Sequence, residues 1–393
     1  MFAMTIKEQA FSWVDSHKDD IISLWKDMVS IDSAIGAKAE GMEIGNLCAA
    51  RLEKLGFKIH RYSFEKCGDT IVGVRGNLEE GKWLFLNGHI DICFYPGDVA
   101  KRPFTIKDGK AYGPGVLDMK GGDTICLSAL EALHDAGYDF PCKVMFVADE
   151  EPAHAFSNNP ELIMKEAKGA KAGFVFETGF TDHSLTVQRK GCWRFFLDTW
   201  GRGCHVGNDP ENGRNAILEM AYKIIEIEKL SKIPEYNINV GIIEGGTVAN
   251  AAPAHCRIEC DFRYIREDQL EYMKGKIDEI IKMNFVPDVT TTFAESVGFL
   301  PMVRLDSTMK MLELANEVSR ENGWPEIGPR LCGGASDAAY TTKMGVPTLC
   351  SAGVEGARNH TVEEWADVES MFYRTKLLIA MLLKLNQDDV VLK

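Results

Sequence analysis

Histidines and carboxylates recur in this chain just after predicted strands. The apolar run 83–86 leads to His89 and Asp91, and the run 143–148 leads to the acidic triplet Asp-Glu-Glu at 149–151. The ends of strands are where α/β proteins place their ligands. Imidazole and carboxylate groups bind hydrolytic metal ions and act as general bases. The pattern therefore indicates metal or acid–base chemistry.

Each of these motifs also has an ordinary interpretation. In the first motif, His89 is a candidate metal ligand, and Asp91 is expected to hydrogen-bond the other imidazole nitrogen, which would orient the ring. Seen alone, this motif is also compatible with a simple loop pair. One glutamate of the triplet 149–151 could bind a cation while its neighbour takes a proton from bound water. A solvated acidic turn is the alternative, and Glu177, after the run 173–176, is uninformative by itself.

Two further stretches add candidate ligands. The glycine-rich stretch 112–122 contains Asp118 directly before a predicted helix, where it could face an ion or cap the helix. The stretch 353–361 contains His360. Two imidazoles and three carboxylates suit two zinc ions bridged by one carboxylate, with open positions for water. The candidate set is His89, Asp118, Glu151, Glu177 and His360.

The cysteines and the charge narrow the class of protein. The eleven cysteines include no Cys-x-x-Cys pair, so we expect no thiolate ligands, and zinc, cobalt or manganese as the metal. Scattered free cysteines are typical of a reducing compartment, and no signal peptide or membrane-spanning run is found, so a cytoplasmic protein is expected. The net charge of −14 argues against a nucleic-acid partner.

The order of predicted elements indicates an α/β protein with an insertion. Strands and helices alternate in residues 1–188, which begin with two predicted helices, and again in residues 301–393. Residues 189–300 predict the order β-α-β-β-α-β, the ferredoxin-like unit. We therefore expect a mixed-sheet domain interrupted by a smaller α+β domain.

Seven motifs in this order resemble the zinc aminoacylase/carboxypeptidase family, which includes acetylornithine deacetylase, succinyl-diaminopimelate desuccinylase and glutamate carboxypeptidase. The resemblance covers almost the whole chain. It implies a phosphorylase/hydrolase-like catalytic domain and a ferredoxin-like lid or dimerisation domain. The motifs are residues 88–91, 113–122, 149–151, 201–205, 245–253, 333–337 and 360–361.

The resemblance also implies roles for the ligands. His89 and Glu177 would complete one zinc site, Glu151 and His360 the other. Asp118 would bridge both ions and be followed by a cis peptide bond.

Further roles are implied for residues around the metal ions. Glu150 would be the general base, taking a proton from the bridging water and delivering it to the leaving amine. His205 would stabilise the oxyanion from the lid, or from a partner chain in dimeric members. Asn250 would touch the substrate from the lid. The backbone near Gly353 would line the substrate pocket. Arg263 and Arg330 would hold a substrate carboxylate, or they could instead form internal ion pairs.

The expected reaction is hydrolysis of an amide bond in a small substrate through a zinc-bound hydroxide. An N-acyl amino acid deacylase and a metallo-carboxypeptidase or dipeptidase both remain open. The loops after Asp91 and Glu151 lack the proline and glycine usual in the family, so no single member's substrate can be transferred. A catalytically inactive metal-binding homologue is the alternative, and a homodimer through the inserted domain is plausible.

Overall fold

The computed structural model describes residues 4–392, which form two compact units. The larger unit contains residues 4–188, 303–331 and 336–392. The smaller unit contains residues 189–302 and the short segment 332–335. This segment belongs with the smaller unit, where the carbonyl of Cys332 accepts the backbone N–H of Lys190 at 2.9 Å.

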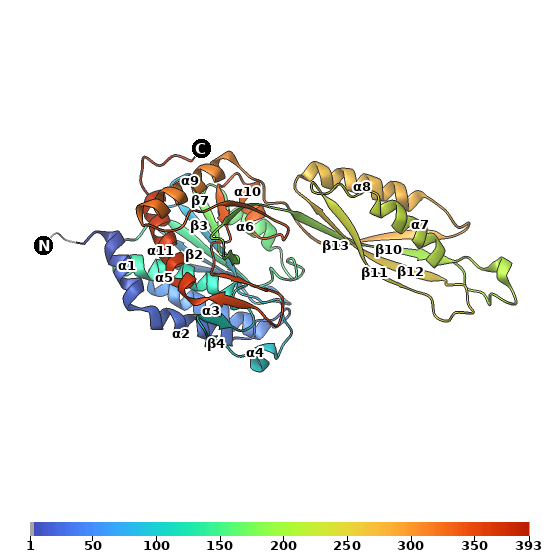
Figure 1. The fold of residues 1–393 in the computed structure, drawn as a ribbon, viewed down its shortest axis with the longest axis horizontal. Helices are drawn as coiled ribbons and strands as arrows, with labels where there is room; N and C mark the ends of the chain where they lie inside the picture. The colour runs from blue at the N-terminus through green and yellow to red at the C-terminus, as the bar shows by residue number, and fades with distance from the viewer. Residues whose placement is uncertain (1–3, 393) are drawn as a thin grey trace. The chain divides into compact units, whose positions relative to one another are not determined.

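A mixed eight-stranded sheet forms the centre of the larger unit (Figure 1). Its middle strands are parallel neighbours and almost wholly buried, as expected for strands covered on both faces. The outer strands β2 and β9 run antiparallel to their inner neighbours. In sheet order the strands are β1 (Lys58–Tyr62), β2 (Thr70–Arg75), β6 (Cys142–Val147), β3 (Leu84–His89), β7 (Ala172–Val175), β15 (Thr348–Cys350), β9 (Leu185–Arg189) and β14 (Pro329–Cys332).

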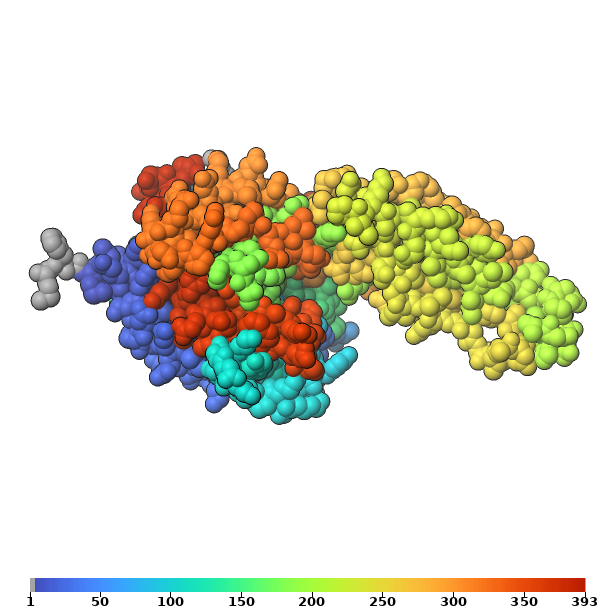
Figure 2. All heavy atoms as spheres, in the orientation of Figure 1, coloured from blue at the N-terminus to red at the C-terminus, as the bar shows by residue number. Residues whose placement is uncertain are grey.

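Helices from both ends of the chain cover this sheet. Helix α5 packs against α1, α2 and α11, and α6 packs against α10. In Figure 2 the N-terminal helices, in blue, lie beside C-terminal residues, in red. No helix within residues 4–392 is long and apolar enough to cross a membrane. The helices are α1 (Ile6–Ser16), α2 (Lys18–Ser30), α3 (Lys38–Lys54), α4 (Asp98–Lys101), α5 (Lys120–Asp135), α6 (Asn159–Ala167), α9 (Asp306–Glu321), α10 (Ala338–Lys343) and α11 (Val368–Leu385).

The N-terminal region differs from the prediction. Two helices were expected in the first 60 residues, and the structure has three because the first breaks at His17. There φ is −113°, and the Ser16 hydroxyl bonds to the carbonyls of Ser12 and Trp13. Local side-chain hydrogen bonds of this kind compete with helix propagation.

A second, five-stranded sheet was not predicted, because its strands are too short to produce a periodic pattern. It pairs β5 with β17, and β17 with β16. These pairings hold the segment that carries His360 next to the chain that leads into Asp118. In sheet order the strands are β4 (Thr105–Lys107), β5 (Lys110–Tyr112), β17 (Trp365–Asp367), β16 (Glu355–Ala357) and β8 (Gly179–Phe180).

The smaller unit is a four-stranded antiparallel sheet with two helices packed on it. Alternate residues of β12 are buried, from Cys256 to Tyr264, so one face of the sheet meets the helices. The order along the chain is β10 (Gly191–Trp200), a short 3₁₀ turn (Pro210–Asn212), α7 (Ala216–Glu228), β11 (Asn237–Gly245), β12 (His255–Tyr264), α8 (Glu267–Lys282) and β13 (Thr290–Phe299).

Candidate metal centre

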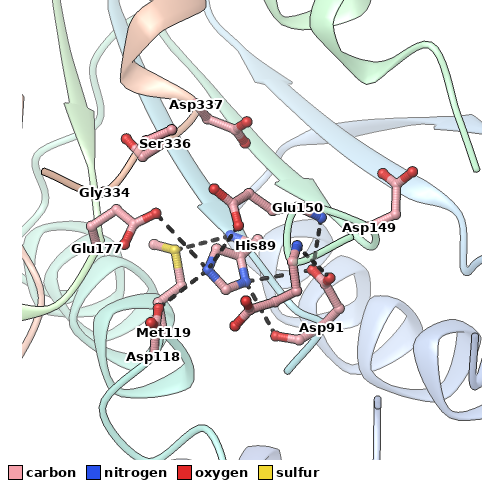
Figure 3. A network of polar contacts seen from close by, with 12 residues as sticks. His89, Asp91, Asp118, Met119, Asp149, Glu150, Glu177, Gly334, Ser336 and Asp337 are labelled. Atoms are coloured by element: carbon pink, nitrogen blue, oxygen red, sulfur yellow. Dashed lines mark hydrogen bonds and ion pairs between the residues drawn. The ribbon is translucent and has the colours of Figure 1, made fainter. Parts of the chain in front are cut away.

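The carboxyl ends of three adjacent parallel strands meet at one place in the larger unit. His89 is the last residue of β3 and pairs in register with Val147 of β6, while Asn87 pairs with Val175 of β7. The acidic triplet after β6 and Glu177 after β7 therefore follow strands that end at the same edge as His89, and Figure 3 shows Glu150 and Glu177 beside the His89 ring. Adjacent parallel strands direct their carboxyl ends to one crevice.

Asp118 lies between two histidines that are far apart in sequence. Its Oδ1 is 3.4 Å from Nε2 of His89, and its Oδ2 is 3.1 Å from Nε2 of His360. Glu177 Oε1 lies 4.0 Å from His89 Nε2, and Glu151 Oε2 lies 3.3 Å from His360 Nε2. The two oxygens of one carboxylate thus face two separate groups of donors, as in a bridging ligand.

The loop that presents Asp118 is held by Glu364, a residue that sequence analysis did not single out. The buried carboxylate of Glu364 accepts the backbone N–H groups of Gly115 at 3.3 Å, Leu117 at 2.8 Å and Asp118 at 3.1 Å. Burial raises the pKa of Glu364 to about 8. The peptide bond after Asp118 is cis, as expected.

Close packing brings the start of α5 against the end of β7. A Cβ added to Gly122 would lie 1.9 Å from the carbonyl oxygen of Phe176, so only glycine allows this approach. Phe176 directly precedes Glu177, and Gly122 follows Asp118 by four residues. The contact therefore fixes these two carboxylates relative to each other.

The loop between β16 and β17 supplies His360 and a second contact to the Asp118 carboxylate. The amide of Asn359 donates to Asp118 Oδ2 at 2.9 Å. The His360 side chain is 48% exposed, whereas that of His89 is 2% exposed. The half of the centre at His360 is therefore the more open one.

Asp91 contacts the far side of the His89 ring. His89 Nδ1 lies 3.1 Å from the Asp91 carbonyl oxygen and 3.4 Å from its carboxylate. The same carboxylate accepts the backbone N–H of Glu150 at 3.1 Å and of Glu151 at 3.0 Å. Asp91 thus contacts the other imidazole nitrogen of His89, as expected, and its hydrogen bonds to the acidic triplet are an addition that the sequence did not predict.

Burial and crowded negative charge shift the pKa values at this centre. Burial, with the nearby carboxylates of Glu177 and Asp337, raises the pKa of Glu150 well above its usual range. Burial opposes the charged form of His89, but contacts with Asp118 and Asp91 raise its pKa above the usual value. Carboxylates so close together need a compensating cation.

His154, which sequence analysis did not single out, connects the acidic triplet to a distant segment of the larger unit. Buried His154 has Nε2 2.8 Å from Asp337 and Nδ1 3.3 Å from Asp149. Burial opposes its charge, but these carboxylates raise its pKa to about 10. The only sequence signal was its position, three residues after the acidic triplet.

The expectation that no thiol would lie among the candidate ligands is wrong. The Sγ of Cys93, a carboxylate oxygen of Glu151 and a ring nitrogen of His360 lie within 4.8 Å of one another. The second compact group contains His89, Asp118 and Glu177 within the same limit. Single cysteines carry no spacing signal, so the sequence could not reveal this contact.

The donor set fits the metal ions that the resemblance implies. Asp118 Oδ1 and Glu151 Oε1 are buried and have no hydrogen-bond partner within the described residues. Leaving a buried carboxylate oxygen unpaired is costly, and a cation in each donor group would satisfy the oxygen of that group. Imidazole and carboxylate groups suit zinc, cobalt or manganese.

Three of the predicted substrate contacts lie in the smaller unit. His205 and Asn250 line a cavity of about 820 Å³ within this unit, and the carbonyl of Asn250 accepts the N–H of Val206. Arg263 makes two hydrogen bonds to Asp261, at 2.5 and 3.0 Å. Its guanidinium is therefore already paired.

The other two predicted contacts lie in the larger unit. Arg330 pairs with Asp182 and Ser184, and its guanidinium stacks 4.0 Å from the ring centre of Phe180. The backbone N–H of Gly353 donates to the carbonyl of Glu177 at 3.0 Å. Gly353 thus lies beside a candidate ligand, while Arg330 is engaged in an ion pair.

The fold and the cluster of buried donors define a metal-dependent hydrolase. The chain belongs to Peptidase family M20/M25/M40, whose model matches residues 85–384. The resemblance seen in the sequence motifs is thereby confirmed.

Individual relatives support this assignment. Carboxypeptidase G2 of Pseudomonas sp. (strain RS-16) is 29% identical over 375 residues, 93% of this chain and 89% of that protein. Acetylornithine deacetylase of Photorhabdus laumondii is 28% identical over 254 residues, 60% and 64% of the two chains.

Solved structures share the fold. Aminopeptidase PepT from Bacillus cereus superposes with a TM-score of 0.76 at 20% identity, covering 94% of this chain and 99% of that one. Human carnosine dipeptidase 1 gives a TM-score of 0.71 at 16% identity, covering 98% and 99%.

Proposed function

We propose that this protein hydrolyses an amide bond of a small peptide or N-acyl amino acid with two metal ions, zinc foremost. The observation that carries the proposal is the position of Asp118, whose two carboxylate oxygens face His89 and His360 separately. The names of its relatives, a carboxypeptidase and a deacetylase, support these two substrate classes. Nothing in the comparisons favours an inactive homologue.

The proposed ligands divide into two sets that share Asp118. One set is His89, Asp118 and Glu177, and the other is His360, Asp118 and Glu151. When bound, the ions would polarise the scissile carbonyl and lower the pKa of an attacking water. Asp91 would orient His89 through Nδ1, leaving Nε2 for the ion. Cobalt or manganese could replace zinc with these ligands.

Glu150 is the proposed general base. Its Oε2 lies 4.0 Å from His89 Nε2, so the carboxyl group borders the proposed metal ligands without being one of them. Two hydrogen bonds to Asp91 hold the backbone at Glu150 and Glu151. Glu150 would take a proton from the attacking water and deliver it to the leaving amine.

The smaller unit is proposed to act as a lid or a dimerisation domain. His205 would donate to the oxyanion of the tetrahedral intermediate, and Asn250 would touch the substrate. A substrate carboxylate would be held by Arg263 or Arg330, which would then share their guanidinium groups with Asp261 or Asp182. Backbone near Gly353 would line the pocket beside Glu177.

A homodimer through the smaller unit is part of the same proposal. Strand β11 is an edge of its sheet, with Ile242 and Ile243 exposed by 51% and 54%. On α7, Tyr222 and Ile225 are also exposed, by 44% and 53%. A second copy of the chain could cover this apolar surface. A cytoplasmic location also remains a proposal, supported by eleven free cysteines.

The test combines metal loading with removal of the general base. The purified chain, loaded with zinc, cobalt or manganese, is assayed against a panel of N-acyl amino acids and dipeptides. Glu150→Gln should keep its metal content and lose activity by about 10²–10⁴-fold, the usual contribution of a general base. Glu317→Gln is the matched control, since Glu317 is an exposed glutamate on α9. Full activity in Glu150→Gln would exclude this mechanism.

A further inference from the structure

Within the two compact groups of donors found among residues 4–392, Cys93 is the member to which neither the motifs nor the proposed mechanism gives a role. It follows Asp91 by two residues and is partly buried. Its Sγ lies within 4.8 Å of both the Glu151 carboxylate and a ring nitrogen of His360. It therefore stands beside the more open half of the metal centre.

The backbone before Cys93 is fixed, so the thiol is held near these ligands. Ile92 is fully buried in a small cluster with Ala34 and Val99, and its N–H donates to the Ser33 carbonyl at 3.0 Å. A Cβ added to Gly115 would lie 2.3 Å from Ile92 Cγ2, so the loop that leads to Asp118 packs directly on Ile92. The position of Cys93 is thus set by the core.

The spacing of the donor atoms suits a tetrahedral ion. Donors bound to zinc at about 2.0–2.3 Å lie roughly 3.3–3.6 Å from one another. His360 Nε2 is 3.1 Å from Asp118 Oδ2 and 3.3 Å from Glu151 Oε2, close to this spacing. The Cys93 Sγ lies within 4.8 Å of both other donors, so it needs an approach of at most about 1.3 Å to join them.

An unpaired buried oxygen points independently to a cation at this half of the centre. The Glu151 side chain is 4% exposed, and its Oε1 has no hydrogen-bond partner in the part of the chain that the structure describes. A carboxylate buried in this way gains most from a bound cation. The thiol of Cys93 lies against the same carboxylate.

We propose that the Cys93 thiolate is a ligand of the ion held by Glu151, His360 and Asp118, an inference that rests on the proposed metal centre. On binding, the S–H bond breaks, its proton leaves to solvent, and a sulfur lone pair forms the bond to a divalent cation. The two ions would then have unlike ligands, one with sulfur and one with nitrogen and oxygen only. Sulfur would favour zinc over manganese at the first of these positions.

Cobalt provides a readout that does not depend on activity. The metal-free full chain is titrated with Co²⁺, and the absorption from sulfur-to-cobalt charge transfer is recorded in the near ultraviolet. The band should appear in the wild type and in Cys332→Ser, a control at another partly buried cysteine. It should be lost in Cys93→Ser and Cys93→Val. The proposal is overturned if the wild type lacks the charge-transfer band or if Cys93→Ser retains it.

A second measurement uses only the wild-type chain, so it stands even if a variant fails to fold. Alkylation of each cysteine is mapped by mass spectrometry with and without zinc. Zinc should protect Cys93 from alkylation, and equal alkylation in both states overturns the proposal. In folded Cys93→Ser, zinc affinity at this position should fall by at least about 10–100-fold. That loss is typical when a residue that only hydrogen-bonds a metal ligand is removed.

The outcomes separate this inference from the proposed function. If the cobalt-loaded chain hydrolyses an N-acyl amino acid but lacks the sulfur band, the ligand assignment to Cys93 falls and the hydrolase proposal stands. If the band is present and no amide substrate is cleaved, the assignment stands and the hydrolase proposal fails.

Discussion

The carboxylate of Asp91 accepts the backbone N–H of Glu150 at 3.1 Å, which connects the strand that carries His89, a proposed metal ligand, to the proposed general base. The same carboxylate accepts the N–H of Glu151 and lies 3.4 Å from Nδ1 of His89. One side chain therefore positions the His89 imidazole, the proposed metal ligand Glu151 and the proposed general base Glu150 together.

Replacing Asp91 should loosen all three groups at once. We expect Asp91→Ala to lower both zinc affinity and kcat by about 10–100-fold, as loss of an outer partner of a metal ligand does. Zinc affinity is measured by competition with a chelator, and kcat on the best substrate of the panel. Asp27→Ala, at an exposed aspartate on α2, is the control. Unchanged affinity and rate in Asp91→Ala would refute this role.

The proposed bridging role of Asp118 predicts a pattern of metal content among variants. The wild type should bind two ions per chain, and Glu177→Ala and His360→Ala should each bind one. Asp118→Ala should bind the fewest ions, because the Asp118 carboxylate faces both histidines. Metal content is measured by mass spectrometry after dialysis. His60→Ala, at an exposed histidine on β1, should match the wild type. Equal metal content in all variants would contradict shared ligation.

The loop before Asp118 should depend on Glu364. Glu364→Ala leaves three buried backbone donors without an acceptor, each costing about 1–3 kcal/mol, so the free energy of unfolding should fall by several kcal/mol. Glu364→Gln keeps a side-chain acceptor, so its free energy of unfolding should fall by less than that of Glu364→Ala. Urea unfolding measures both changes. Glu363→Ala removes only an exposed ion pair with Arg358 and should change the stability by less than about 1 kcal/mol.

Stability should depend on pH through His154. Its pKa in the folded chain is raised from 6.5 to about 10, so the charged ring's stabilisation is fully present below pH 6.5 and is lost as the pH rises through 10. The upper bound of this contribution is about 5 kcal/mol.

The test compares urea unfolding of the wild type and His154→Gln from pH 6 to pH 10. The difference in unfolding free energy between the two chains should shrink as the pH rises. His134→Gln, at a partly exposed histidine paired with Asp139, is the matched control. A difference that stays constant over this pH range would show that His154 is not charged in the folded protein.

The sequence by itself determined which residues could serve as ligands and roughly which elements carry them. His89, the acidic triplet and Glu177 follow apolar runs, and adjacent parallel strands direct their ends to one edge. Strand and helix periodicity is a local property, so the βαββαβ order of the smaller unit could also be predicted from it.

Only the tertiary structure decided what surrounds those ligands. Cys93, Glu364 and His154 each contact a residue that is at least 58 positions away along the chain. None of the three belongs to a periodic pattern or to a motif with a fixed spacing. For Arg330 the sequence left open a substrate carboxylate and an internal ion pair, and the structure pairs it with Asp182, which is far away along the chain. Burial and pairing are set by contacts between distant segments, and the order of residues along the chain does not specify these contacts.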